Sequence, residues 1–263
     1  MSGIDLGNLY SVAGKTVLVT GGVGGLGRML SGAFVAAGAR VYITGRKPEA
    51  LAEAVAELGA TGTVFGIHAD LGTPEGVATV ISELTAREKH LDVLLNNAGQ
   101  TWGKPFGEFP SKAWSPVMTV NVQAPFELTQ GLLPLLAAAA TEASPARVIN
   151  IGSVYAETTE VMNAYSYTAS KAAIHQLTRV MAHDLAARGI LVNAIAPGLF
   201  PSKMTHFVLR DDTARDALLK SIPLGRAGTP EDIAGLAMFL SSRAGSYITG
   251  AVIPIDGGIL IAH

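Results

Sequence analysis

Tyr167 and Lys171 carry side chains that could act together on a proton. They are four residues apart, so on a helix they lie on one face, because 3.6 residues per turn nearly superimposes positions i and i+4. A free tyrosine has a pKa near ~10, and a fixed cation close by favours the phenolate. The pair therefore predicts a general acid and base that works near neutral pH. Because chance also supplies this spacing, the surrounding sequence must decide.

The composition predicts one globular domain and argues against several classes of function. The chain has 263 residues and a net charge of −2, so it offers no basic surface for nucleic acid. It has no cysteine, which excludes disulfides, thiol catalysis and thiolate metal sites. Hydrophobic residues make up 49% and charged residues 15%, which favours an oligomer that buries further surface.

The start of the chain lacks the pattern of a signal peptide, and no apolar run reaches the ~18 residues of a membrane span. We therefore expect a soluble, cytoplasmic protein without a membrane partner. We also expect no metal, because His175 and His183 are eight residues apart with no third ligand in place. Surface or interface positions are expected for both histidines.

Strand and helix patterns alternate along the whole chain, which is typical of an α/β fold with a doubly wound parallel sheet. We expect a short arm at residues 1–13 and a single domain at 14–263, with a flap over the site at about 199–223. The expected strands are 16–20, 40–44, 63–68, 91–95, 147–151, 190–196 and 251–255. The expected helices are 28–37, 48–58, one from about 74, 114–136, 164–188 and 229–241, the last with Thr229 as its N-cap.

A glycine-rich turn follows the first strand. Gly21, Gly25 and Gly27 stand between this strand and the first helix, where glycine permits a tight turn and a close approach of the backbone to a pyrophosphate. The helix N-terminus then points its amides at the negative charge. This position predicts dinucleotide binding rather than a merely structural turn.

The end of the second strand indicates which dinucleotide is bound. An acidic residue there would accept a ribose 2′-hydroxyl, but this chain has Gly45 followed by Arg46 and Lys47. A guanidinium pairs well with a 2′-phosphate, so NADP(H) is favoured and NAD(H) stays possible. The alternative is that Arg46 and Lys47 only begin a solvated helix.

Polar and small residues follow the other strands. Asp70 could accept from an adenine amino group or cap the helix near Pro74, and Asn97, Ala98 and Gly99 suit a close cofactor contact. Asn121 lies inside an apolar helical pattern, where an amide needs a partner.

Taken together, these motifs closely resemble the classical short-chain dehydrogenase/reductase family over residues 14–258. The motifs are Thr20-Gly21-x3-Gly25-x-Gly27, Asn96-Asn-Ala-Gly99, Asn121, Ser153, Tyr167-x3-Lys171 and Pro197-Gly198. Residues 148–154 and 195–205 are most similar to the 3-oxoacyl reductase branch, including its rhamnolipid-linked reductases. The resemblance implies a single Rossmann-like sheet of seven strands in the order 3-2-1-4-5-6-7, an NAD(P) cofactor, and a homotetramer or otherwise a homodimer.

The resemblance also implies roles for single residues. Tyr167 would be the general acid and base, Lys171 would lower its pKa and bind the cofactor ribose, Ser153 would orient the carbonyl, and Asn121 would hold a water that leads to solvent. The implied cofactor-binding set is Gly21, Gly25, Leu26, Gly27, Arg46, Asp70, Leu71, Asn97, Ala98, Gly99, Tyr167, Lys171, Pro197, Gly198, Phe200 and Ser202. Gly24 stands where many NADP-linked relatives have a basic residue, so Arg46 carries most of the NADP prediction.

We expect NADPH-dependent reduction of a ketone with apolar bulk, in a pocket lined by Trp102, Tyr155, Met162 and Phe207. An NAD-dependent alcohol, sugar or steroid dehydrogenase working oxidatively is the alternative. A catalytically idle nucleotide-sensing module is a remote one, since the catalytic set is intact.

Overall fold

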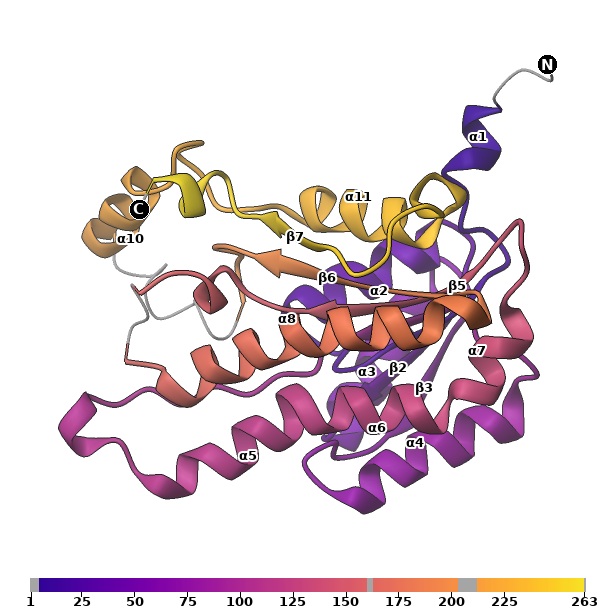
Figure 1. Cartoon of the computed structure of the whole chain (residues 1–263), viewed down its shortest axis with the longest axis horizontal. Helices are drawn as coiled ribbons and strands as arrows, with labels where there is room; N and C mark the ends of the chain where they lie inside the picture. Colours follow the sequence, from indigo (N-terminus) through magenta and orange to yellow (C-terminus); the bar gives the residue numbers. More distant parts are fainter. Residues whose placement is uncertain (1–4, 160–162, 203–211, 263) are drawn as a thin grey trace.

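Seven parallel strands form one sheet in the order β3-β2-β1-β4-β5-β6-β7, which confirms the predicted fold class (Figure 1). The structure is a computed structural model and describes residues 5–159, 163–202 and 212–262. The strands are β1 (Thr16–Val19), β2 (Arg40–Gly45), β3 (Val64–His68), β4 (Val93–Asn96), β5 (Ala146–Ile151), β6 (Ile190–Pro197) and β7 (Val252–Ile255). The order reverses between β1 and β4, and ligands of such sheets bind at that switch point.

Helices cover both faces of the sheet, as the long runs of buried residues in its strands require. The α-helices are α1 (Leu6–Leu9), α2 (Gly25–Ala36), α3 (Pro48–Gly59), α4 (Pro74–Arg87), α5 (Trp114–Met118), α6 (Ala124–Gly131), α7 (Leu133–Ala139), α8 (Tyr165–Leu185), α10 (Asp212–Lys220) and α11 (Pro230–Ser241). The short helical turns are η1 (Phe106–Glu108), η2 (Ser111–Ala113), η3 (Thr119–Gln123), η4 (Val154–Ala156), η5 (Ala186–Arg188), η6 (Arg243–Gly245) and η7 (Ile259–Ile261).

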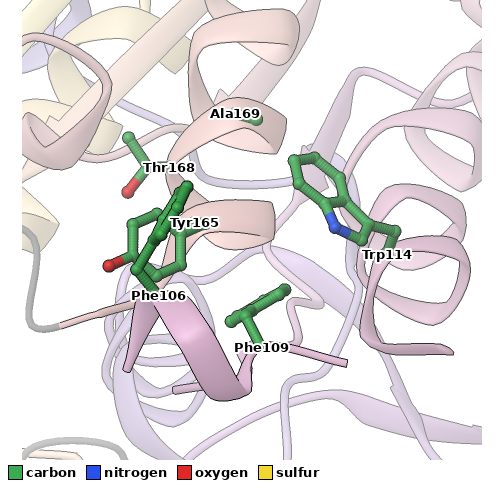
Figure 2. Close-up of a pocket in the computed structure, with 6 residues that line it drawn as sticks. All are labelled: Phe106, Phe109, Trp114, Tyr165, Thr168 and Ala169. Carbon is green, nitrogen blue, oxygen red and sulfur yellow. The ribbon is translucent and has the colours of Figure 1, made fainter. Parts of the chain in front are cut away.

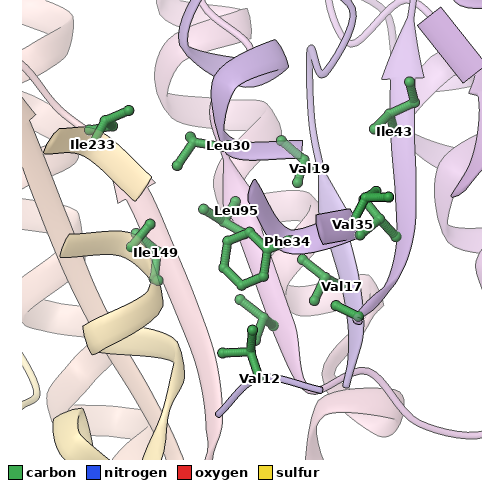
Figure 3. Close-up of a cluster of buried hydrophobic side chains, with 14 of the residues drawn as sticks. Val12, Val17, Val19, Leu30, Phe34, Val35, Ile43, Leu95, Ile149 and Ile233 are labelled. Carbon is green, nitrogen blue, oxygen red and sulfur yellow. The ribbon is translucent and has the colours of Figure 1, made fainter. Parts of the chain in front are cut away.

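Alternate residues of β1, β2, β4 and β5 pack into two separate cores. Val17 and Val19 of β1 belong to the core that includes residues of α2, α3 and α11. Figure 3 shows the part of this core around Phe34 of α2. Leu18, between those two valines, points to the other face and packs with α4, α6 and α8. This two-residue alternation sends neighbouring side chains of a strand to opposite faces of the sheet.

The predicted continuous helix at 114–136 is wrong. Thr119–Gln123 is a π-helical turn, and the chain breaks again at Leu132 before α7 begins. Pro134, at the start of α7, has no N–H to continue the helical bonding, which explains the second break. The predicted start of α11 is confirmed, because Thr229 forms a full capping box with Asp232.

The turn between β1 and α2 brings two parts of the backbone very close together. A Cβ at Gly27 would lie 2.2 Å from the Gly21 carbonyl oxygen and 2.4 Å from Asn97 Nδ2. Gly21 itself has a φ of 66°, in the left-handed region that glycine favours. By contrast, a Cβ at Gly24 would meet no atom within 4 Å.

Within the described part of the chain, no helix is both long enough and apolar enough to cross a membrane.

We expect Gly27→Ala to lower the free energy of unfolding by about 2 kcal/mol, because the new methyl group overpacks against backbone that cannot move aside. Gly24→Ala is the control in the same turn, and because Gly24 is the N-cap of α2 we expect it to lower the stability by no more than about 1 kcal/mol. Urea unfolding followed by circular dichroism measures both. Equal losses in the two variants would show that this close approach does not limit stability.

Candidate active site

The predicted site residues gather at the carboxyl edge of the sheet, where β1, β4, β5 and β6 end. Gly21 follows β1, Asn97 follows β4, Ser153 follows β5 and Pro197 ends β6. Since these four strands are neighbours, segments far apart in sequence meet at one edge.

The glycine turn is fastened to the end of β4. The Thr20 hydroxyl accepts hydrogen bonds from the backbone N–H groups of Asn97 and Ala98, both at 2.9 Å. The Asn97 amide in turn donates to the Thr20 carbonyl at 2.8 Å. Gly27 lies directly against the Gly21 carbonyl, with no room for a side chain between them. The backbone of this turn therefore forms a closely packed cradle at the N-terminus of α2.

The side chains of Ser153, Tyr167 and Lys171 meet beside this cradle. The Ser153 hydroxyl hydrogen-bonds the Tyr167 phenol. Lys171 Nζ lies 5.4 Å from the centroid of the Tyr167 ring, and it donates to the Ile151 carbonyl at 2.6 Å. Ser153 and Lys171 are both buried, with 6% and 4% of their surfaces exposed. Two hydroxyl donors are thus directed at one small region, where an oxygen that gains negative charge could be stabilised.

Burial controls the protonation of this group. It lowers the pKa of Lys171 from its ordinary value of 10.5 to about 8, because a charged ammonium is poorly solvated there. It also raises the pKa of Tyr167, and the hydrogen bond from Ser153 offsets only part of that rise. In this structure burial of the phenolate dominates and raises the Tyr167 pKa, so the lowering by Lys171 that the family resemblance implies stays a prediction.

Asn121 lies in the π-helical turn, and its side chain joins two segments. Its Oδ1 accepts from the Gln100 N–H at 2.8 Å, and its Nδ2 donates to the Gln100 carbonyl and to Ser170 Oγ, both at 2.9 Å. The buried amide of Asn121 thus has partners on the loop after β4 and on α8. The π turn breaks the regular helical bonding at the residue that makes these contacts.

The other residues of the predicted cofactor set differ in exposure. Arg46 is exposed just after β2. Ser202 lies beside the glycine turn, since its Cβ is 3.4 Å from where a Cβ at Gly25 would be. Leu71 and Phe200 are buried in the two cores. Asp70 Oδ1 accepts from the Gly72 N–H.

The N-cap of α4 is Thr73, whose hydroxyl accepts from the Gly76 N–H, so the helix-capping alternative for Asp70 is wrong.

Of the four predicted substrate-contact residues, Met162 and Phe207 lie outside the described residues. Tyr155 packs edge-on against Tyr167 with ring centroids 6.4 Å apart, so it borders the reactive phenol. Trp102 is partly buried on the loop after β4.

An aromatic hollow of about 550 Å³ opens at the N-terminal end of α8 (Figure 2). Its lining residues are Phe106, Phe109, Trp114, Tyr165, Thr168 and Ala169. The nearby Tyr165 belongs to this hollow, where Phe106 and Phe109 pack edge-on against its ring, and not to the Ser153 group.

The expected surface or interface position of His175 is wrong, whereas the His183 side chain is 90% exposed. His175 is 3% exposed, and its Nε2 accepts from the Ser153 N–H at 3.4 Å. One sequence signal could have revealed it: His175 continues the i, i+4, i+8 row that starts at Tyr167 and Lys171. Among the described residues, no three His, Asp or Glu side chains are grouped as metal ligands.

Comparison with known proteins adds independent findings. The family model described as enoyl-(acyl carrier protein) reductase matches residues 21–260. The rhamnolipids biosynthesis 3-oxoacyl-[acyl-carrier-protein] reductase of Pseudomonas aeruginosa is 47% identical over 252 residues, which is 95% of this chain and 97% of that protein. Gluconate 5-dehydrogenase of Gluconobacter oxydans is 35% identical over 97% of this chain and 98% of its own.

Among solved structures, the Pseudomonas aeruginosa RhlG/NADP active-site complex matches with a TM-score of 0.94. It is 45% identical in sequence, and the match covers 96% of this chain and 99% of that one.

The lowered pKa of Lys171 predicts a pH-dependent stability. Between about pH 8 and 10 the unfolded chain keeps its lysine proton while the folded chain loses it, so the free energy of unfolding rises with pH. We expect wild type to gain about 2 kcal/mol over this range relative to Lys171→Met, which lacks the titrating group. Parallel urea titrations at each pH measure the difference. A constant difference would mean that Lys171 keeps an ordinary pKa.

Proposed function

The chain belongs to the short-chain dehydrogenase/reductase family, and from this premise we propose that it reduces a ketone to a secondary alcohol with NADPH, reversibly. The observation that carries the proposal is the meeting of the Ser153 and Tyr167 hydroxyls with buried Lys171, beside a glycine cradle at the sheet's switch point. The geometry provides two donors for one oxygen, which is what carbonyl reduction requires.

The cradle fits a dinucleotide. No side chain can stand at Gly27, and a side chain at Gly21 would meet Ala98 Cα at 3.1 Å, so the backbone here is bare where a pyrophosphate must approach closely. The twelve-residue helix α2 begins at this point, and its N-terminal amides favour negative charge. We propose the full predicted cofactor set as the binding surface, with Arg46 at the 2′-phosphate.

Bound NADPH would supply the hydride, and the chain's own residues manage the proton. Tyr167 holds a proton at its phenol oxygen and donates it to the carbonyl oxygen as negative charge develops there. Ser153 donates a second hydrogen bond to the same oxygen and fixes its position. Lys171 keeps a positive charge behind the phenol and orients the helix through the Ile151 carbonyl. Asn121 ties this helix to the loop after β4 and lies on the route by which the proton is replaced.

We propose a ketone with apolar bulk as the substrate, with a 3-oxoacyl thioester as the first compound to test. The support is the 47% identity to a reductase of that substrate class over nearly the whole chain. Tyr155 and Trp102 would border the substrate, together with Met162 and Phe207. A sugar acid is the second candidate, supported by the 35% identity to gluconate 5-dehydrogenase.

We also propose a homotetramer, or otherwise a homodimer, built on the face of α5, α6 and α8. Trp114, Phe126 and Val180 on these helices expose 43%, 41% and 47% of their surfaces to solvent, which favours coverage by a second copy. A flap at about 199–223, an arm at 1–13 and a cytoplasmic location stay predictions from the sequence.

Tyr167→Phe removes the proton donor and should lower kcat for reduction of an accepted ketone with NADPH by about 10³-fold. The Kd of NADPH should rise by less than about 10-fold, because Tyr167 is only one of many residues in the proposed cofactor set. Tyr165→Phe, two residues away on the same helix, is the matched control and should keep wild-type activity. Initial rates of NADPH oxidation and a fluorescence titration of NADPH binding measure these effects. Retained turnover in Tyr167→Phe would contradict the proposed mechanism.

Arg46→Ser should lower kcat/KM for NADPH by about 10-fold to 100-fold, because a charge-assisted bond to the 2′-phosphate is lost. The same variant should change kcat/KM for NADH by less than about 3-fold, since NADH has no such phosphate. Lys47→Ser is the neighbouring control. A wild type that strongly prefers NADH would refute the role of Arg46.

A further inference from the structure

His175 occupies a place that the catalytic residues do not explain. On α8 it follows Lys171 by four residues and Tyr167 by eight, so the three side chains form one row along the helix. His175 is buried, although an imidazole is seldom placed inside a core without partners. It belongs to no metal cluster among the residues that the structure describes.

Two side chains of this row hold the same piece of backbone. Lys171 Nζ donates to the carbonyl of Ile151, and His175 Nε2 accepts from the N–H of Ser153 at 3.4 Å. These contacts lie on either side of Gly152, so the segment that delivers the Ser153 hydroxyl is held by α8 at both ends.

Gly152 makes the imidazole contact possible. A Cβ at this position would lie 2.1 Å from His175 Nε2 and 2.6 Å from its Cδ2. Any side chain at residue 152 would therefore push the imidazole away from Ser153. The ring and the bare backbone fit one another.

The tautomer of His175 follows from its neighbours. Since the Ser153 N–H is a donor, Nε2 must be unprotonated, and Nδ1 then carries the proton. Nδ1 faces Glu157 Oε1 at 3.5 Å, on the segment just after η4. Burial, with the cations Lys171 and Arg179 nearby, lowers the pKa of His175 to about 4, so the ring stays neutral at physiological pH.

We propose that His175 is a positioning residue that holds Ser153 in place for the carbonyl oxygen, with Glu157 fixing the orientation of its ring. The proposal rests on the ketone reductase function proposed above and adds a third residue of α8 to it. His175 touches neither the substrate nor the cofactor in this role, and it acts only through the backbone of Ser153.

A double-mutant cycle between His175 and Ser153 tests this role. His175→Leu removes the acceptor and keeps most of the bulk, and we expect kcat for the ketone to fall by about 10-fold to 100-fold with little change in NADPH binding. In a Ser153→Ala background the same substitution should cost less than about 3-fold, because the hydroxyl that it positions is already absent. His175→Gln, whose Oε1 can accept the Ser153 N–H, should recover most of the rate.

Controls separate a positioning role from a general loss of structure. His183→Leu changes an exposed histidine of the same helix and should leave the rate unchanged, and circular dichroism with thermal unfolding checks that each variant folds. If His175→Leu does not fold, Glu157→Leu is taken through the same cycle, and the loss of kcat that it causes should disappear in the Ser153→Ala background.

The outcomes distinguish the two proposals. If His175→Leu lowers kcat by the same factor with and without the Ser153 hydroxyl, the positioning role of His175 is overturned and the reductase function stands. A wild type that binds NADPH but reduces no ketone would overturn the proposed function itself. Non-additive losses in an active enzyme support both.

Discussion

A single buried hydrogen bond, from the Lys171 ammonium to the carbonyl of Ile151, sets the geometry of the site. Burying an ammonium is unfavourable unless it gains partners, and the lowering of its pKa to about 8 shows that the penalty is only partly offset. Ile151 is the last residue of β5, so the bond fastens α8 to the strand that delivers Ser153. Once this contact forms, helix geometry places Tyr167 one turn earlier, on the same face.

The cradle does not depend on the bond from Lys171 to Ile151, because separate hydrogen bonds hold it. The turn after β1 is held by β4 through Thr20 and Asn97, and the bare backbone at Gly27 admits no side chain. Asn121 connects the two halves, since its amide bonds both the loop after β4 and Ser170 on α8. The cradle and the Tyr167 phenol on α8 are therefore both fixed to one sheet. The π-helical turn is the local irregularity that makes the connection possible.

The sheet, and the residues that meet at the candidate site, could be predicted because they depend on local signals. Buried strands read as β-branched runs, and glycine and proline mark the turns at their ends. The break at Leu132, the π turn at Asn121 and the buried contact of His175 depend instead on which helix face meets which strand. That information is spread over distant residues such as Gly152 and Glu157, so no short window of sequence contains it. The Tyr167 pKa escaped prediction for the same reason, because the amount of burial is a property of the assembled fold.

Burial shifts the pKa values of Tyr167 and Lys171 in opposite directions, and these shifts set the protonation of both groups. It raises the pKa of Tyr167, so the phenol is protonated throughout the neutral range. It lowers the pKa of Lys171 only to about 8, so most lysines still carry their charge at pH 7. A protonated phenol beside an ammonium is the state from which a carbonyl oxygen can be given a proton. Oxidation of an alcohol needs the phenolate, which this environment disfavours until the pH rises. The protein environment by itself therefore favours the protonated phenol, which is the form that the proposed carbonyl reduction would use.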